Sequence, residues 1–312
     1  MKILITGGFG FVGSHLAEKL IKNRHKVILV TKSYKKKKNV SHILRKAIIE
    51  KFDITNQKKI ELCIEKHKPE IIIHLAGETS HSKSFEKPLL DIDLNAKTTL
   101  FILEKIRMMN LKCKFILGSS FIVVGKPKKL PVNEETSCNP TTLYGANRLL
   151  SEQYCMIYSK VFNLDTIVFR ITNSFGPREQ IIPNKNAINY LIYKAFKGED
   201  ITIFNKGEFF RDLIFISDVI NAIELIIKKG KSGELYWISS GKKTWFYNIG
   251  KILQKLTDAK RKFINTPKYT KKVDVGNFVV ENSKMRSLGW KPKISIEDGI
   301  NQTLKYFKEN NM

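Results

Sequence analysis

Short runs of apolar and β-branched residues alternate with helical stretches through the first half of the chain. The first run, residues 2–6, is an almost uninterrupted apolar strand, and the later strands are separated by stretches with helical spacing. Strands are predicted at residues 2–6, 26–30, 71–75, 114–117 and 166–170, and helices at residues 14–23, 57–66, 94–109 and 145–161. Near-continuous apolar strands joined by helices are typical of a parallel sheet covered on both faces. The fold expected is therefore α/β, with a doubly wound parallel Rossmann sheet.

The alternation weakens after Pro177. Short strands are predicted there at residues 201–204, 213–216 and 235–238, and helices at residues 187–196, 219–228 and 249–256. They suggest a smaller α/β lobe that closes over the carboxyl edge of the sheet, where such folds bind ligands. We expect a first unit of residues 1–176 and a C-terminal substrate lobe of residues 177–312, with an interleaved boundary.

Composition places the chain among globular proteins. It has 312 residues, of which 42% are hydrophobic and 27% charged. Charges interrupt the longest apolar runs well before the roughly 18 residues of a membrane span, and the N-terminus lacks the pattern of a signal peptide. The four cysteines lie far apart, without a C-x-x-C pair, and the histidines show no metal-ligand spacing. We expect a cytoplasmic, reduced protein without a membrane segment, a disulfide framework or a metal site.

The chain is strongly basic. It carries 55 Lys and Arg against 29 Asp and Glu, a net charge of +26. Such a charge favours polyanionic partners, including nucleic acid and phosphorylated small molecules. The lysines are scattered, however, and no aromatic and basic stripe of a recognised RNA-binding module is visible. Nucleic acid is therefore not expected as a partner, and a non-catalytic nucleic-acid-binding protein is only a remote alternative.

A glycine-rich loop joins the first strand to the first helix. Residues 6–13 read Thr-Gly-Gly-Phe-Gly-Phe-Val-Gly, which fits both common glycine patterns of dinucleotide-binding loops. Glycines allow the tight turn and let the backbone approach a pyrophosphate, while the helix N-terminus attracts its negative charge. We therefore expect a dinucleotide at Gly7, Gly10, Phe11 and Val12, the alternative being a purely structural turn.

The end of the second strand bears on which dinucleotide binds. The usual fingerprint has an acidic residue there, which binds the adenosine ribose. This chain has Thr31 and Lys32 instead. A hydroxyl and a cation suit a 2′-phosphate, so NADP is slightly favoured over NAD. Asp53, followed by Ile54, is placed to accept a hydrogen bond from adenine, although it could equally be an ordinary turn residue.

Candidate acid–base residues follow the strand at residues 114–117. Ser119 and Ser120 come directly after it, and Tyr144 opens a helix on which Arg148 lies one turn further on. A fixed positive charge beside a tyrosine favours the phenolate, and a serine hydroxyl can hold a substrate alcohol beside that base. A tyrosine and an arginine on a helix are otherwise most often packing and surface residues.

These segments resemble the extended short-chain dehydrogenases/reductases, in their branch of nucleotide-sugar epimerases and dehydratases. The resemblance covers nearly the whole chain. It rests on residues 6–13, 74–77, 118–120, 144–148, 170–177, 210–212 and 283–290. These motifs are specific for the family and much less specific for the substrate.

The resemblance implies roles for single residues. Tyr144 would be the acid–base group acting on a sugar hydroxyl, and Ser120, with Ser119 beside it, would orient the sugar. Leu75, Ala76 and Gly77 would contact the cofactor. Asn173 would touch the sugar or diphosphate, Arg211 would bind the diphosphate, and Lys271 or Lys272 falls where a further phosphate-binding residue is common. Arg211 could alternatively pair with Asp212 or Asp218.

Position 148 departs from the family pattern, which has lysine there to hold the nicotinamide ribose. Arg148 keeps a positive charge and hydrogen-bond donors, but it cannot lose a proton and its head group is wider. Charge stabilisation should survive, whereas a proton relay through this residue is in doubt.

The expected function is that of an NAD(P)-dependent epimerase of a nucleoside-diphosphate sugar, acting most readily at C4. The alternatives are an NADP-dependent 4-keto-sugar reductase and a nucleotide-sugar dehydrogenase. Family 4,6-dehydratases carry an Asp-Glu pair after the catalytic hydroxyl, where this chain has Phe121-Ile122, which argues against dehydration. The resemblance also implies a homodimer, built on the helices predicted at residues 94–109 and 145–161.

Overall fold

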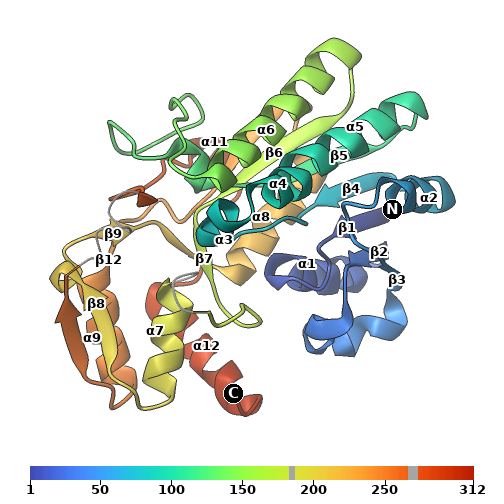
Figure 1. Cartoon of the computed structure of the whole chain (residues 1–312). Coiled ribbons are helices and arrows are strands. Elements are labelled where there is room, and N and C mark those ends of the chain that lie inside the picture. Colours follow the sequence, from blue (N-terminus) through green and yellow to red (C-terminus); the bar gives the residue numbers. More distant parts are fainter. Residues whose placement is uncertain (183–186, 266–272) are drawn as a thin grey trace.

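The computed structural model describes residues 1–182, 187–265 and 273–312 (Figure 1). Its main feature is a seven-stranded sheet with the order β11-β6-β5-β4-β1-β2-β3, in which every neighbouring pair is parallel. The strands are β1 (Lys2–Thr6), β2 (Lys26–Thr31), β3 (Ile48–Lys51), β4 (Ile71–His74), β5 (Lys114–Ser120), β6 (Thr166–Ile171) and β11 (Glu234–Ile238). The predicted doubly wound parallel sheet is confirmed.

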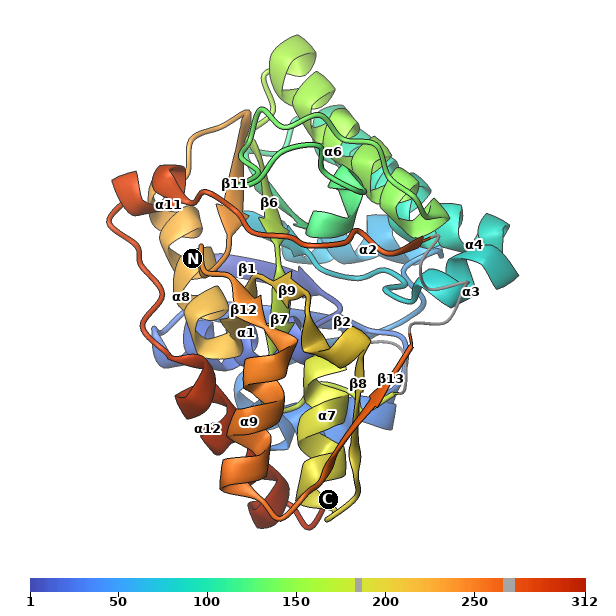
Figure 2. The same cartoon turned by 90° about the vertical axis from the view of Figure 1, so that its left-hand side faces the viewer.

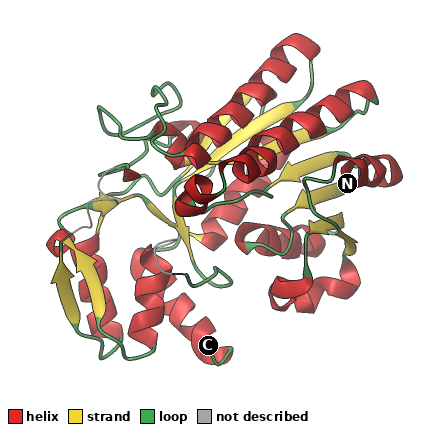
Figure 3. Cartoon of the chain, in the orientation of Figure 1, coloured by secondary structure: helices red, strands yellow, loops and turns green. Residues whose placement is uncertain are grey.

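Helices cover both faces of this sheet, as Figure 3 shows with helices on either side of the strands. On one face α1 (Phe11–Lys22) and α8 (Ile216–Lys229) pack on the sheet, and on the other α2 (Gln57–His67), α5 (Thr98–Met108) and α6 (Leu143–Phe162). Strand β1 shows why both faces must be covered: Ile3 and Ile5 enter the first core and Leu4 enters the second. The near-continuous apolar strands of the sequence are thus explained by burial on both faces.

The C-terminal lobe lies below the carboxyl edge of the sheet in Figure 2. It contains α7 (Ala187–Phe196), β8 (Ile201–Phe204), α9 (Phe246–Leu256), β13 (Arg261–Ile264) and α12 (Ile296–Glu309). Strands β8 and β13 form a two-stranded sheet within the lobe, and two further two-stranded sheets are β7 (Asn173–Phe175) with β10 (Leu213–Phe215) and β9 (Phe210–Arg211) with β12 (Thr244–Trp245). Helix α11 (Ser283–Ser287) contacts β11, an edge strand of the main sheet.

The structure corrects several predicted elements. The strand expected at residues 235–238 belongs to the large sheet, since β11 pairs with β6, and α8 packs on α1 rather than in the small lobe. Strand β3 was not predicted. The helix expected at residues 94–109 is broken: a π-helical turn, η2 (Asp93–Lys97), precedes α5. The interleaving of the two units therefore extends far into the second half of the chain.

The remaining helices are η1 (Tyr34–Lys46), α3 (His81–Glu86), α4 (Pro88–Ile92), η3 (Phe121–Val124) and η4 (Asn205–Gly207), of which η4 contacts α9, β8 and β13 of the C-terminal lobe. In the part of the chain that the structure describes, no helix is both long and apolar enough to cross a bilayer. All four cysteines are free thiols, and Cys63, Cys113 and Cys155 are buried.

Candidate active site

The glycine loop forms a tight cradle between β1 and α1. Gly7 has a φ of +70°, a conformation that favours glycine, and a Cβ there would lie 3.0 Å from the backbone nitrogen of Ala76. A Cβ on Gly13 would lie 2.4 Å from the carbonyl oxygen of Gly7. Gly10 donates its N–H to that same oxygen at 2.8 Å, so the loop closes on itself just before α1 starts at Phe11. The loop and helix N-terminus have the form that binds a pyrophosphate.

Thr6 ties this cradle to the next strand. Its hydroxyl oxygen accepts hydrogen bonds from the N–H groups of Leu75 and Ala76, both at 3.1 Å, and lies 2.8 Å from Nδ1 of His74. Burial, reinforced by the charge of Arg148, lowers the pKa of His74 to about 3. The imidazole is therefore neutral at physiological pH. These contacts bring Leu75 and Ala76 next to Gly7, as expected for three residues lining one cofactor site.

At the end of β2, Lys32 and Asp53 contact each other, whereas the sequence suggested a separate cofactor contact for each. Lys32 forms an ion pair with Asp53, with 2.7 Å between Nζ and Oδ2, and the hydroxyl of Thr31 donates to the carbonyl of Ser33. Burial raises the pKa of Asp53, but the hydrogen bonds from Lys32 and Thr55 outweigh it and leave that pKa below its ordinary value. The charge of Lys32 is thus partly compensated, and Ile54 is buried behind the pair.

Helix α6 brings Tyr144 and Arg148 together. The hydroxyl of Thr142 accepts from the N–H of Gly145 and caps the helix, so Tyr144 lies in its first turn, with 5% of its surface exposed. Arg148 is one turn further on and only 3% exposed. Its Nε and Nη1 atoms find no hydrogen-bond partner among the described residues. Buried guanidinium donors without acceptors fit a bound group that offers oxygens, such as the ribose of a nicotinamide dinucleotide.

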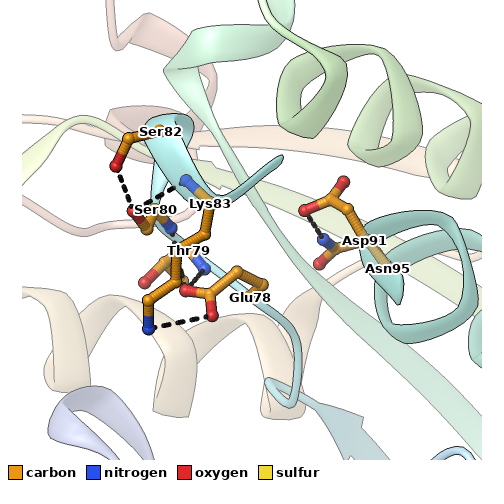
Figure 4. Close-up of polar contacts among 7 residues, drawn as sticks. All are labelled: Glu78, Thr79, Ser80, Ser82, Lys83, Asp91 and Asn95. Atoms are coloured by element: carbon orange, nitrogen blue, oxygen red, sulfur yellow. Dashed lines mark hydrogen bonds and ion pairs between the residues drawn. The ribbon is translucent and has the colours of Figure 1, made fainter. Parts of the chain in front are cut away.

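Gly77 makes room for Arg148. A Cβ at this position would lie 2.3 Å from Oδ1 of Asn95 and 3.2 Å from Nη2 of Arg148. Asn95 lies in the π-helical turn and is held there by Asp91, whose carboxylate accepts from Asn95 at 3.0 Å and from Asn147 of α6 at 2.7 Å (Figure 4 shows the first contact). The turn that interrupts the predicted helix therefore fixes the start of α6 and leaves space for a wide arginine head group.

A buried ion pair lies beside the carboxyl end of β5. Glu152 and Arg170, 2% and 4% exposed, approach to 2.6 Å, and the Ser119 hydroxyl donates to Glu152. Ser119, expected to contact substrate, is 7% exposed and has Glu152 as its hydrogen-bond partner. Ser120 differs: it is partly exposed and lies where β5 meets η3, accepting from the N–H of Ile122 at 3.4 Å.

Arg211, which is expected to bind phosphate, forms an ion pair with an acidic residue that the sequence did not indicate. Arg211, 8% exposed, donates from Nη2 to Asp274 at 2.6 Å, and neither Asp212 nor Asp218 pairs with it. Asp212 instead accepts from the backbone N–H groups of Ser240, Gly241 and Val280. Burial raises its pKa to about 6 against these hydrogen bonds.

Asn173 starts β7 next to this cluster, with its backbone N–H bonded to the carbonyl of Asp212 at 3.2 Å. Its buried Oδ1 has no hydrogen-bond partner in the described structure, which fits contact with a polar ligand. Lys271 lies outside the described residues. Among those described, no three His, Cys, Asp or Glu side chains are grouped to hold a metal ion.

Sequence reasoning missed several residues of the site because their partners are remote. Asp274 reaches Arg211 from 63 residues away, and Asp91 reaches Asn147 from 56. The Glu152–Arg170 pair could have been suspected, since Glu152 lies one helical turn after Arg148 and Arg170 begins a family motif. His81 contacts Tyr144 with 5.8 Å between ring centroids, a contact that no motif indicates.

The chain is similar to known proteins over nearly its whole length. The family model described as GDP-mannose 4,6 dehydratase matches residues 4–303. A protein of Methanocaldococcus jannaschii described as a putative UDP-glucose 4-epimerase is 30% identical over 309 residues, which cover 99% of each chain.

Solved structures are similar over the full length. A UDP-glucose 4-epimerase of Thermotoga maritima, solved with UDP-glucose, superposes with a TM-score of 0.92 at 30% identity and covers 100% of both chains. A UDP-glucuronic acid 4-epimerase of Bacillus cereus, solved with UDP-glucuronic acid and NAD, has a TM-score of 0.87 at 26% identity and covers 99% of this chain and 100% of its own.

Proposed function

Because the chain belongs to the NAD-dependent epimerase/dehydratase family of extended short-chain dehydrogenases/reductases, we propose that it is a nucleotide-sugar 4-epimerase with Tyr144 as its acid–base group. The observation that carries this proposal is the meeting of three features at the carboxyl edge of the sheet: the glycine cradle, Ser120 at the end of β5, and Tyr144 one turn before Arg148. Nucleoside-diphosphate sugars are the substrate class of the similar enzymes, among them UDP-glucose 4-epimerases.

The chain's own residues would divide the work as follows. The Tyr144 phenolate removes the proton of the sugar hydroxyl, and Ser120 holds that oxygen in place by a hydrogen bond. The fixed charge of Arg148 stabilises the phenolate, and its free Nε and Nη1 donors hold the nicotinamide ribose. A bound nicotinamide dinucleotide would supply the chemistry of reversible hydride transfer. The epimer would result when the hydride is returned to the opposite face of the keto carbon and Tyr144 gives its proton back to the oxygen.

Substrate recognition would fall to the C-terminal side of the site. Arg211 would bind the diphosphate, for which the planar guanidinium is suited, and the unpartnered Oδ1 of Asn173 would accept from the nucleotide sugar. Arg211 would then share its donors between the diphosphate and Asp274. Phe121 and Ile122, both buried, occupy the positions at which family dehydratases have acids, so 4,6-dehydration is not proposed.

A 4-keto-sugar reductase or a dehydrogenase is the second candidate, favoured by the missing acid at the end of β2. A hydroxyl in place of that acid would suit the 2′-phosphate of NADP, whereas Lys32 is already paired with Asp53. Denaturing the purified protein and identifying any released dinucleotide separates the two candidates. Tightly held NAD or NADH supports the epimerase, which regenerates its cofactor in each cycle. Preferential binding of NADPH supports the reductase.

The acid–base role is tested with Tyr144→Phe, with UDP-glucose as the first substrate tried. Turnover should fall at least about 10²-fold, because the hydroxyl proton loses its acceptor. Tyr154→Phe, on the same helix but packed against the second core, is the matched control and should keep wild-type activity. Undiminished turnover by Tyr144→Phe would show that the base is another residue.

We also propose a homodimer built on α5 and α6. Large apolar side chains are exposed on these helices: Met108 at 63%, Ile157 at 48%, Val161 at 61% and Phe162 at 44%. Neighbouring exposed apolar side chains of this size are typical of a surface that another protein covers. Light scattering of the purified protein measures the mass directly.

A further inference from the structure

A hollow in the C-terminal lobe lies outside the proposed active site. It has a volume of about 440 Å³ and is lined by residues of η4, β12, α9 and β13. The labels of β12 and α9 mark its place at the left-hand end of Figure 1. Three aromatic side chains line it and keep much of their surface exposed: Trp245 at 40%, Tyr247 at 40% and Phe263 at 45%. Exposed aromatic side chains gathered around a hollow are typical of a site that a ligand covers.

The hollow and Arg211 lie on opposite faces of the ribbon that β9 and β12 form. In this ribbon Trp245 stands opposite Phe210, and Thr244 stands opposite Arg211. Residues directly opposite each other share a face and successive residues alternate, so Trp245 and Arg211 point to different faces. In agreement with this, the rings of Trp245 and Phe210 meet edge to face with 5.1 Å between their centroids. The hollow is therefore distinct from the proposed diphosphate site.

Trp245 stands at a position where another residue type would stabilise the helix better. It is the N-cap of α9, and no side chain caps this helix. Serine, threonine, aspartate and asparagine are the residues that stabilise a helix start by accepting from its first N–H groups, which tryptophan cannot do. The first turn of α9, which includes Tyr247 and Asn248 of the lining, therefore offers N–H groups to an anion beside the hollow.

Basic side chains accompany the aromatic ones. Nζ of Lys251 lies 4.7 Å from the ring centroid of Tyr247, and the guanidinium of Arg261 lies 5.4 Å from the same centroid. The guanidinium of Arg261 is also 6.0 Å from the ring centroid of Phe263. Tyr247 thus holds two cations beside the hollow by cation–π contacts. Lys206 lines the hollow from η4, which adds a third positive charge.

The backbone of η4 presents Lys206 in an unfavourable conformation. Asn205, Lys206 and Gly207 have φ angles of +45°, +54° and +77°. Only the lysine of the three is a residue type that seldom adopts this left-handed conformation. Close packing holds the turn, because a Cβ on Gly207 would lie 2.4 Å from the backbone nitrogen of Tyr247. Backbone strain that the surrounding structure maintains occurs most often at binding sites, and here it fixes Lys206 beside the start of α9.

The lining indicates the chemistry of the ligand. Exposed aromatic rings stack on the flat ring of a nucleobase whatever its identity, and lysine binds phosphate as a point charge. Glu208 is the single acid among the lining residues that the structure describes, so the hollow and the cations beside it carry a net positive charge. Its volume lies in the range of small-molecule sites, and a hollow lacks the protruding apolar face that inserts into a membrane. A nucleobase that carries a phosphate fits all of these features.

We propose that this hollow is a second nucleotide site, which binds a nucleoside phosphate, either free or as one unit of a single-stranded nucleic acid. The base stacks on Trp245, and the phosphate lies between Lys206 and the first turn of α9. Tyr247 acts as a positioning residue, because it holds Lys251 and Arg261 beside the bound phosphate. The inference does not depend on the proposed sugar chemistry, since none of these residues belongs to the proposed active site.

NMR of the tryptophan indole N–H groups tests the proposal at the site itself. The chain has three tryptophans, and Trp237 and Trp290 are buried. In protein saturated with NAD, which fills the proposed cofactor site, AMP should shift the indole signal that is missing from Trp245→Phe and leave the other two unchanged. The dissociation constant should be below about 1 mM. Glucose 1-phosphate and adenosine should each bind at least about tenfold more weakly, because the first lacks the base and the second lacks the phosphate.

Variants away from the reporting tryptophan show which residues bind AMP. Lys206→Glu should weaken AMP binding at least about tenfold, because it replaces the cation at the phosphate by an acid. Lys22→Glu makes the same charge change in the last turn of α1 and is the matched control, with unchanged affinity. Arg211→Met should also keep the affinity for AMP, because it alters only the proposed diphosphate site. If Arg211→Met abolishes the shift and Lys206→Glu does not, AMP occupies the substrate site and the proposal is overturned.

The remaining arms identify the source of the nucleotide or refute the site. Oligoadenylate that binds at least about tenfold more tightly than AMP identifies a single strand, whereas equal affinity identifies a free nucleotide. Equal binding of AMP and glucose 1-phosphate overturns the role of the base. A Trp245 signal that moves with phosphatidylglycerol vesicles but not with AMP shows a membrane contact instead and overturns the proposal. None of these measurements uses sugar turnover, so a failure of the proposed function leaves their outcome unaffected.

Discussion

Removing Arg170 should destabilise the protein far more than removing the whole ion pair that it forms. In the structure Arg170 and Glu152 are 4% and 2% exposed, and three hydrogen bonds of 2.6–3.2 Å join them. Arg170→Met leaves the Glu152 carboxylate buried without its counter-charge, which costs about 3–5 kcal/mol. At roughly 2 °C per kcal/mol for a chain of this size, the melting temperature should fall by at least about 6 °C.

The double variant Glu152→Met with Arg170→Met removes both charges and keeps the volume of the side chains. The Ser119 hydroxyl then loses its acceptor, which costs about 1–3 kcal/mol, and the thiol of Cys138 loses the weaker hydrogen bond from Arg170, while new apolar packing offsets part of these losses. The double variant should therefore melt above the single one. Differential scanning calorimetry at pH 7.5 measures both. If the melting temperature of the double variant is equal to or below that of Arg170→Met, the uncompensated charge of Glu152 is not the main cause of the destabilisation, and the reasoning is refuted.

Three further changes have defined outcomes. Gly77→Ala places a Cβ 2.3 Å from Oδ1 of Asn95, so NAD affinity measured by calorimetry should fall and stability should drop by about 1–3 kcal/mol; wild-type binding and stability would contradict the geometry. The pKa of His74 is about 3 when folded and about 6.5 when unfolded, so acidification between these values favours unfolding. His74→Gln should therefore reduce the fall in unfolding free energy between pH 6 and 4 by about 1.4 kcal/mol per pH unit, measured by urea denaturation at each pH. If the unfolding free energy of the variant falls with pH as steeply as that of the wild type, His74 is protonated in the fold. Val161→Glu, 61% exposed on α6, should give a monomer by light scattering with an unchanged far-ultraviolet spectrum, whereas a retained dimer would place the interface elsewhere.

The fold could be predicted where local pattern and burial agree. Strand β4 is four buried isoleucine and histidine residues, and such a run has few alternatives to a central parallel strand. Strand β3 escaped prediction because Glu50 and Lys51 interrupt its apolar pattern at the edge of the sheet. Strand β11 was recognised as a strand but assigned to the wrong unit, since its pairing with β6 spans more than 60 residues and leaves no local trace.

For the site, too, the sequence indicates the kind of chemistry but not which residues lie beside one another. Glycine spacing and the tyrosine–arginine pair indicate the kind of chemistry because each depends on neighbouring residues. The partners of these residues are set by tertiary contacts, so Asp274 beside Arg211 and His81 beside Tyr144 could not be predicted. Ser119 and Ser120 illustrate the limit within two residues: alternation along β5 sends one hydroxyl to Glu152 and leaves the other at the strand end.

The exchange of lysine for arginine at position 148 makes physical sense only together with its surroundings. A wider head group needs space, and Gly77 leaves that space where any Cβ would crowd Nη2 of Arg148. The extra donors need acceptors, and the unpartnered Nε and Nη1 atoms would find them on a bound cofactor. Arg148→Lys alone would therefore leave a void beside Gly77 and remove donors from the cofactor site, so weaker NAD binding is expected from restoring the family's usual residue.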